Sequence, residues 1–81
     1  MIPKIIAARH VQGFVIHLRF ADGTEGDVNF DSELDGDVFL PLKNLSYFKE
    51  FILHPDLHTL TWPNGADFAP EFLYDKIQIP A

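Results

Sequence analysis

Residues 14–20, FVIHLRF, together with the residues that follow them, ADGTEGDVNF at 21–30, decide the fold. Every second residue from Phe14 to Phe20 is apolar and falls on one face of an extended chain. His17 and Arg19 fall on the opposite face. Alternation with a period of two predicts a strand that buries one face and exposes the other.

The turn after Phe20 can be chosen by testing which register keeps that face apolar. A two-residue Asp22-Gly23 loop would place acidic side chains on it. A three-residue loop, with Gly23 left-handed, keeps it apolar, so we predict the longer loop. The predicted partners are Phe20 with Thr24, Arg19 with Glu25, His17 with Asp27, Ile16 with Val28 and Phe14 with Phe30.

A further strand precedes Phe14. Gln12-Gly13 can close a two-residue hairpin loop, which predicts a three-stranded meander. In this register the apolar residues share one face. The predicted partners are Val11 with Phe14, Ala7 with Leu18 and Ile5 with Phe20.

Residues 31–45 show neither the two-residue period of a strand nor the 3.6-residue period of a helix, so we predict an irregular crossing there. A short helical turn from Ser46 to Phe48 is expected to follow it. Four apolar side chains are the expected core anchors of the crossing. They are Leu34, Val38, Phe39 and Leu42.

Residues 51–54 and 59–62 predict a second hairpin around Pro55-Asp56, and Asn64-Gly65 predicts a tight turn. Asp67 is the expected cap of a C-terminal helix that tolerates Pro70 in its first turn. The helix face expected to pack on the sheet contains Phe68, Phe72, Leu73 and Ile77. These elements make one α+β domain over residues 1–81. Whether the two hairpins join one sheet stays open.

Composition narrows the classes of function. The 81 residues carry twelve acidic and six basic side chains, a net charge of -6, and no cysteine. Clustered basic residues, which nucleic-acid binders use, are missing, so we expect no direct nucleic-acid binding. No apolar run reaches a membrane span, and the first residues lack a signal-peptide pattern, so we expect a cytoplasmic protein. A basic protein partner suits the charge.

Seven acidic residues lie between Asp22 and Asp37, without a Lys or Arg among them. The run from Asp31 to Asp37 resembles the first half of a calcium loop. The twelfth position of such a loop would be Leu42, where a bidentate Glu is needed. We therefore expect a solvated acidic loop and no metal.

The histidines suggest two further kinds of site. His54 and His58 are four residues apart, but Pro55-Asp56 places them across a turn, so we expect no zinc site. His17 opposite Asp27 resembles a general base held by a carboxylate, yet no nucleophile stands beside it. The chain also lacks a glycine-rich phosphate loop, so we expect no cofactor and no enzymatic activity.

The segment from Trp62 to Tyr74 holds the candidate binding residues. Trp62 and Tyr74 are residue types common both at interfaces and in cores. Asp67 and Glu71 could frame a cleft beside Trp62, or could complement the positive end of a helix. The candidate binding residues are Trp62, Asn64, Asp67, Glu71 and Tyr74.

These residues resemble the bacterial family catalogued as domain of unknown function 2442, over most of the chain. The matching motifs are Phe20-x-Asp22-Gly23, Leu34-x-Gly36-x-Val38-Phe39-x-Pro41-Leu42, Tyr47-Phe48 and Trp62-Pro63-Asn64-Gly65-Ala66-Asp67-Phe68-x-Pro70-Glu71-x-Leu73-Tyr74. The resemblance implies a small α+β domain that sometimes precedes a helix-turn-helix domain. We expect this chain to be too short for that second domain.

The family resemblance also implies a partner, because members are often encoded beside another small uncharacterised protein in pairs resembling toxin–antitoxin modules. It supplies no catalytic residue. Our leading hypothesis is a noncatalytic interaction module, the antitoxin-like partner of a co-encoded protein. The alternatives are a small-ligand-binding or enzymatic domain with a cleft near Trp62, Asp67 and Glu71, and a homo-oligomer that self-associates through an edge strand or aromatic patch.

Overall fold

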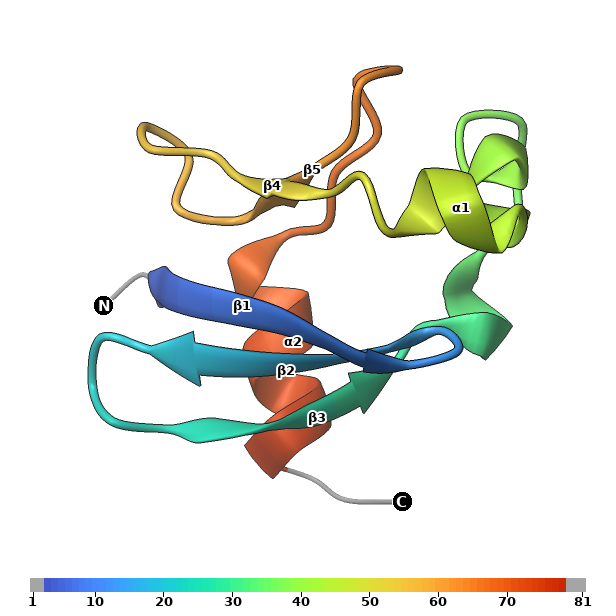
Figure 1. Cartoon of the computed structure of the whole chain (residues 1–81). Coiled ribbons are helices and arrows are strands. Elements are labelled where there is room, and N and C mark those ends of the chain that lie inside the picture. The colour runs from blue at the N-terminus through green and yellow to red at the C-terminus, as the bar shows by residue number, and fades with distance from the viewer. Residues whose placement is uncertain (1–2, 79–81) are drawn as a thin grey trace.

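Three antiparallel strands form the main sheet, in the order β1-β2-β3 (Figure 1). They are β1 (Ile5–Gln12), β2 (Val15–Phe20) and β3 (Glu25–Asn29). The structure is a computed structural model, and it describes residues 3–78. Ile16, Leu18 and Phe20 are buried, so the alternation in the sequence correctly identified the face of β2 that packs on the core.

The predicted pairing of β2 with β3 is confirmed. Ile16 lies opposite Val28, His17 opposite Asp27 and Arg19 opposite Glu25. The backbone N–H of Phe20 donates to the Thr24 oxygen, and Gly23 has a φ of 93°, as the three-residue loop requires. The backbone N–H of Phe30 also donates to the Phe14 oxygen.

The predicted pairing of β1 with β2 is right only at its start. Ile5 lies opposite Phe20, but Ala8 lies opposite Leu18 and Gln12 opposite Val15, with register shifts after Ile5 and after His10. Each shift inserts an extra residue into β1, as a β-bulge does, and moves the following side chains to the other face. The prediction assumed an unbroken ladder and so placed the wrong residues on the core face.

The bulges decide which side chains of β1 reach the core. Ala8 packs against the core, whereas Ala7 and Val11 are exposed. The ring of His10 contacts Phe48 edge-on, and its Nε2 lies 2.8 Å from the Gly13 oxygen. The hairpin loop is therefore Gly13-Phe14 and not the predicted Gln12-Gly13.

The crossing from residue 31 contains three short helical segments, η1 (Asp31–Glu33), η2 (Leu40–Lys43) and α1 (Leu45–Phe48). The Asn44 side chain caps α1 by accepting a hydrogen bond from the N–H of Ser46. A helical turn ending at Phe48 is thus confirmed, one residue longer than predicted.

Three of the four predicted anchors of the crossing are correct. Leu34 and Leu42 are fully buried, and Phe39 packs against the core while half-buried. Val38 is 45% exposed, so its prediction as an anchor was wrong. The N–H groups of Phe39 and Leu40 both donate to the Gly36 oxygen. In this tight turn Phe39 points inward and its two sequence neighbours are exposed.

The second hairpin is confirmed and forms a separate sheet. Its strands are β4 (Ile52–Leu53) and β5 (Leu60–Thr61). It lies beyond the β1 edge of the main sheet (Figure 1), where the N–H of Ile5 donates to the His58 oxygen at 3.0 Å. The question that the sequence left open is thus answered: the two hairpins do not share one sheet.

Helix α2 (Pro70–Gln78) crosses one face of the main sheet (Figure 1). It passes β3 closely: a Cβ added to Gly26 would lie 3.1 Å from Cγ2 of Ile77. Leu73 is fully buried and Tyr74 and Ile77 pack against the core, but Phe72 is 40% exposed. Successive helical residues are about 100° apart, so the stripe containing 73, 74 and 77 leaves position 72 outside it. Including Phe72 in the packed face was therefore wrong.

The core lies between the main sheet, α2, the crossing and the second hairpin. Among residues 3–78, fourteen apolar side chains are buried in it, contributed by all of these parts. They are Ile5, Ile16, Leu18, Phe20, Val28, Phe30, Leu34, Leu42, Phe48, Leu60, Trp62, Ala66, Phe68 and Leu73. Over residues 3–78, no helix has the length and apolar character needed to cross a membrane.

Candidate functional site

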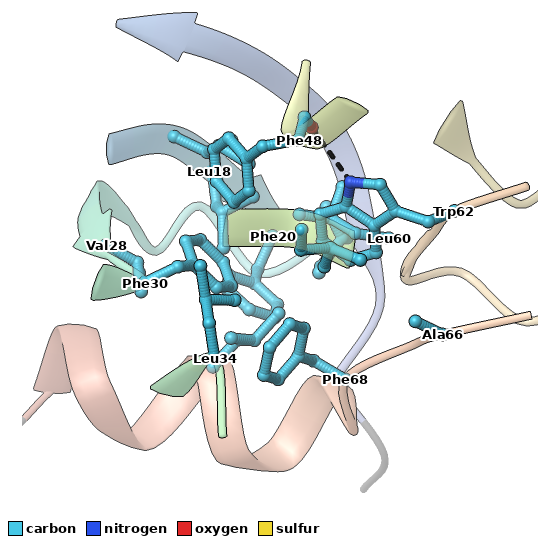
Figure 2. Packing of buried hydrophobic residues seen from close by; sticks show 14 residues of the cluster. Leu18, Phe20, Val28, Phe30, Leu34, Phe48, Leu60, Trp62, Ala66 and Phe68 are labelled. Atoms are coloured by element: carbon cyan, nitrogen blue, oxygen red, sulfur yellow. Dashed lines mark hydrogen bonds between the residues drawn. The ribbon is translucent and has the colours of Figure 1, made fainter. Parts of the chain in front are cut away.

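Trp62, the most distinctive of the predicted binding residues, lies in the core and is only 3% exposed (Figure 2). Its indole Nε1 donates a 2.8 Å hydrogen bond to the backbone oxygen of Phe48. The rings that pack around it within 6.4 Å, measured between centroids, are Phe30, Phe48, Phe51 and Phe68. The indole is thus covered by the protein, and its N–H already has a partner.

Asn64 lies at the tip of a turn that repeats the geometry of the β2–β3 loop. The N–H of Trp62 donates to the Ala66 oxygen, and Gly65 has a φ of 88°. Asn64 Oδ1 accepts from the N–H of Ala66, as Asp22 Oδ1 accepts from that of Thr24. Asn64 Nδ2 donates to the Val38 oxygen at 2.8 Å, so this side chain connects the turn to the crossing.

Asp67 and Glu71 are both exposed, and they lie in different local structures. Asp67 forms an isolated antiparallel bridge with Thr61, so the chain is still extended there. The hydroxyl of Thr59 donates to the Phe68 oxygen at 2.6 Å and holds the same segment. Helix α2 begins only at Pro70, which makes the prediction of Asp67 as its cap wrong. Glu71 lies in the first turn, where a carboxylate complements the helix dipole.

Tyr74 connects α2 to the β2–β3 loop. Its hydroxyl donates to Asp22 Oδ2 at 2.6 Å and accepts from the Thr24 hydroxyl at 3.3 Å. Its ring meets Phe20 edge-on at 5.0 Å between centroids. The hydrogen bond from Tyr74 is the main cause that lowers the pKa of Asp22, and the N–H of Thr24 adds to it.

The structure places the five candidate residues in separate local structures. Trp62 packs beneath α1, Asn64 holds the crossing, and Tyr74 holds the opposite hairpin loop. The side chains of these three residues form hydrogen bonds within the protein, while Asp67 and Glu71 are exposed to solvent. The segment is distinctive because it joins separate parts of the fold.

The histidine pairs that the sequence suggested as candidate sites lie at or near the surface. His17 Nδ1 lies 2.7 Å from Asp27 Oδ1, as the strand register predicts. His54 Nδ1 accepts from the N–H groups of Asp56 and Leu57, which closes the β4–β5 loop. Within the described residues, no three His, Asp or Glu side chains gather in a way that could hold a metal ion.

A hollow of about 500 Å³ opens at the tip of the β1–β2 hairpin. It is shallow, and the Oδ1 atom of Asn29 in its wall already accepts from the N–H of Asp31. Its lining residues are Gln12, Gly13, Phe14, Val15, Asn29 and Asp31.

A row of stacked aromatic rings reaches the surface on another side of the molecule. Phe39 stacks on Phe68 with centroids 4.9 Å apart, and Phe68 stacks on Phe72 at 6.2 Å. Lys76 Nζ lies 5.2 Å from the centroid of the Phe72 ring and 2.8 Å from Glu33 Oε1. Phe68 is buried, but Phe72 is 40% exposed, so the row ends in a ring that is partly open to solvent.

Two further apolar side chains, next to Phe39 in the sequence, are exposed. Val38 and Leu40, on either side of Phe39 in the sequence, are 45% and 50% exposed. We call the surface formed by Val38, Phe39, Leu40 and Phe72 the aromatic face. Clustered exposed apolar side chains are uncommon on monomeric proteins and mark interaction sites more often than isolated ones do.

The sequence did not predict the aromatic face because its pattern assigned Val38 and Phe72, both exposed, to the core. One signal was present. The apolar run Val38-Phe39-Leu40 directly follows the acidic residues Asp35 and Asp37. A short turn in such a segment can bury one apolar side chain only by exposing its neighbours.

Comparison with known proteins assigns the chain to a family. No curated protein and no solved structure matched it. The model of one family, described as a protein of unknown function (DUF2442), matches residues 5–78. That span runs from β1 to the end of α2 and includes every motif on which the resemblance rested. The chain therefore belongs to the DUF2442 family.

Proposed function

We propose that this domain is a noncatalytic protein-interaction module that binds another protein through the aromatic face. The observation that carries the proposal is the ring of Phe72, which is 40% exposed and is joined by stacking to Phe68 and Phe39. Aromatic residues are enriched in the cores of protein interfaces. A ring held by stacking also loses little conformational freedom when it binds.

The use of polar groups inside the fold supports the noncatalytic part of the proposal. The side chains of Trp62, Asn64 and Tyr74 all form hydrogen bonds to other parts of the chain. A small ligand near Trp62, Asp67 and Glu71 has less support, because the indole is covered by other aromatic rings.

The proposed partner is the protein encoded beside this one, with the present chain as its acidic, antitoxin-like member. A net charge of -6 suits a basic partner, since opposite charges speed association and select among partners. We also propose that the protein acts in the cytoplasm, together with this partner.

The test is co-expression with the product of the neighbouring gene, followed by co-purification and titration calorimetry. We expect a stable complex that survives size-exclusion chromatography. If both proteins are folded and show no heat of binding at about 0.1 mM, the paired module is wrong.

A further inference from the structure

Acidic residues are close in sequence to residues of the aromatic face in both of its segments. On α2, Glu71 precedes Phe72 and Asp75 lies almost one turn after it, and both are exposed. In the crossing, Asp35 and Asp37 are exposed directly before Val38. Among residues 3–78, none of these four carboxylates has an ion-pair partner within 4.0 Å. An occupant of this face therefore meets negative charge around an apolar centre.

The cation beside Phe72, Lys76, is already neutralised. Lys76 forms an ion pair with Glu33 at 2.8 Å while its ammonium lies over the ring of Phe72. This contact also shows what the ring accepts, because the electron-rich face of an aromatic ring attracts cations. The ring and the nearby carboxylates therefore both favour an occupant that carries positive charge.

We propose that the aromatic face docks a basic amphipathic segment of the partner, with an apolar side chain against Phe72 and Leu40 and Lys or Arg side chains against the four carboxylates. This proposal rests on the proposed function and adds the chemistry of the partner. Charge complementarity selects this occupant. A second copy of the chain, a nucleic acid or an anionic membrane would bring further negative charge to the same place.

The probe is a synthetic 16-residue peptide of Lys and Leu, with the leucines on one helical face. Its binding to the ¹⁵N-labelled protein is followed by NMR and by titration calorimetry. We expect the largest shift changes at Val38, Leu40 and Phe72. Two control peptides, one with the leucines scattered and one with Glu in place of Lys, should bind at least about tenfold more weakly.

Matched variants separate docking from general attraction to an acidic protein. D35N/D37N and the control E50Q/D56N remove the same charge from exposed positions. Phe72→Ser and the control Ile52→Ser remove exposed apolar side chains, and Ile52 is 57% exposed. D35N/D37N and Phe72→Ser should each weaken binding at least about fivefold, while their controls stay within about twofold.

Four outcomes of the experiments on the peptides and variants overturn the inference. They are equal effects of variant and control, shift changes centred elsewhere, no binding at about 1 mM peptide, and a dimer of the protein that Phe72→Ser dissociates. A neighbouring gene product that binds with an affinity unaffected by D35N/D37N also overturns it, but leaves the proposed function standing.

Discussion

The indole Nε1 of Trp62 donates to the backbone oxygen of Phe48 at 2.8 Å, inside the core (Figure 2). Phe48 ends α1, and Trp62 directly follows β5. The bond therefore fixes the end of the crossing against the second hairpin. Since a buried carbonyl without a partner is costly, this single contact explains why a tryptophan suits the position.

Trp62→Phe should destabilise the protein, because it leaves the Phe48 oxygen unpaired and removes part of the packed ring. We expect a loss of about 1–3 kcal/mol from the unpaired oxygen alone. Urea denaturation at neutral pH measures it. Ile52→Ala, at an exposed position, should stay within about 0.5 kcal/mol. Equal midpoints for the two variants would show that the bond contributes nothing.

Tyr74→Phe should change how stability depends on acid. The Tyr74 hydroxyl lowers the pKa of Asp22 in the folded protein relative to the unfolded chain. The stability that this shift contributes is therefore present above the unfolded pKa, and is lost as the pH falls through the folded pKa. In Tyr74→Phe the pKa of Asp22 should rise, and this part of the acid dependence should diminish.

An NMR titration of the Asp22 side-chain carbon in both proteins, between about pH 5 and pH 2, follows this change. Tyr47→Phe serves as the control, because it removes a tyrosine hydroxyl elsewhere. An unchanged Asp22 titration in Tyr74→Phe would mean that the 2.6 Å contact does not hold the carboxylate.

Asn64→Asp should separate the two roles of this side chain. Asp retains the oxygen that accepts from the N–H of Ala66, as Asp22 does in the equivalent loop, but loses the donor to the Val38 oxygen. We expect a loss of about 0.5–1.5 kcal/mol and faster amide exchange at Phe39 and Leu40. Asn64→Ala, which loses both bonds, should cost more. Equal losses in the two variants would indicate that the bond from the N–H of Ala66 is negligible, and no loss in Asn64→Asp would indicate the same for the bond to Val38.

Leu42→Ala and Val38→Ala should differ sharply, although both residues are apolar and lie in the crossing. Leu42 is fully buried, so its truncation should cost about 2–5 kcal/mol. Val38 is 45% exposed, and its truncation should cost no more than about 0.5 kcal/mol. Thermal and urea denaturation compare them. Similar losses would mean that Val38 is buried after all.

The β2–β3 hairpin could be predicted from sequence because two constraints agreed. Only the three-residue loop kept the apolar face intact, and Gly23 could take the left-handed conformation that this loop needs. The β1–β2 pairing failed because a bulge leaves little trace in a short strand whose two faces are both partly apolar. Ile5 and Ile6 are alike in sequence, yet one is buried and the other exposed.

The site was harder to predict than the fold. Trp62 and Tyr74 attract attention as interface types, but tertiary contacts decide whether such a ring is covered, and those contacts come from distant segments. The position of Phe72 depended on where α2 begins. An Asp67 cap would have begun the helix two residues early, and the actual start at Pro70 follows from the bridge between Asp67 and Thr61.

Binding of a protein partner through the aromatic face can be tested by comparing three forms of the chain. Titration calorimetry compares the binding of the neighbouring gene product to the unmodified chain, to Phe72→Ser and to Ile52→Ser. We predict at least about a tenfold loss of affinity for Phe72→Ser and less than about a twofold change for Ile52→Ser. Equal affinities in all three, or no binding by the unmodified chain, would contradict the claim.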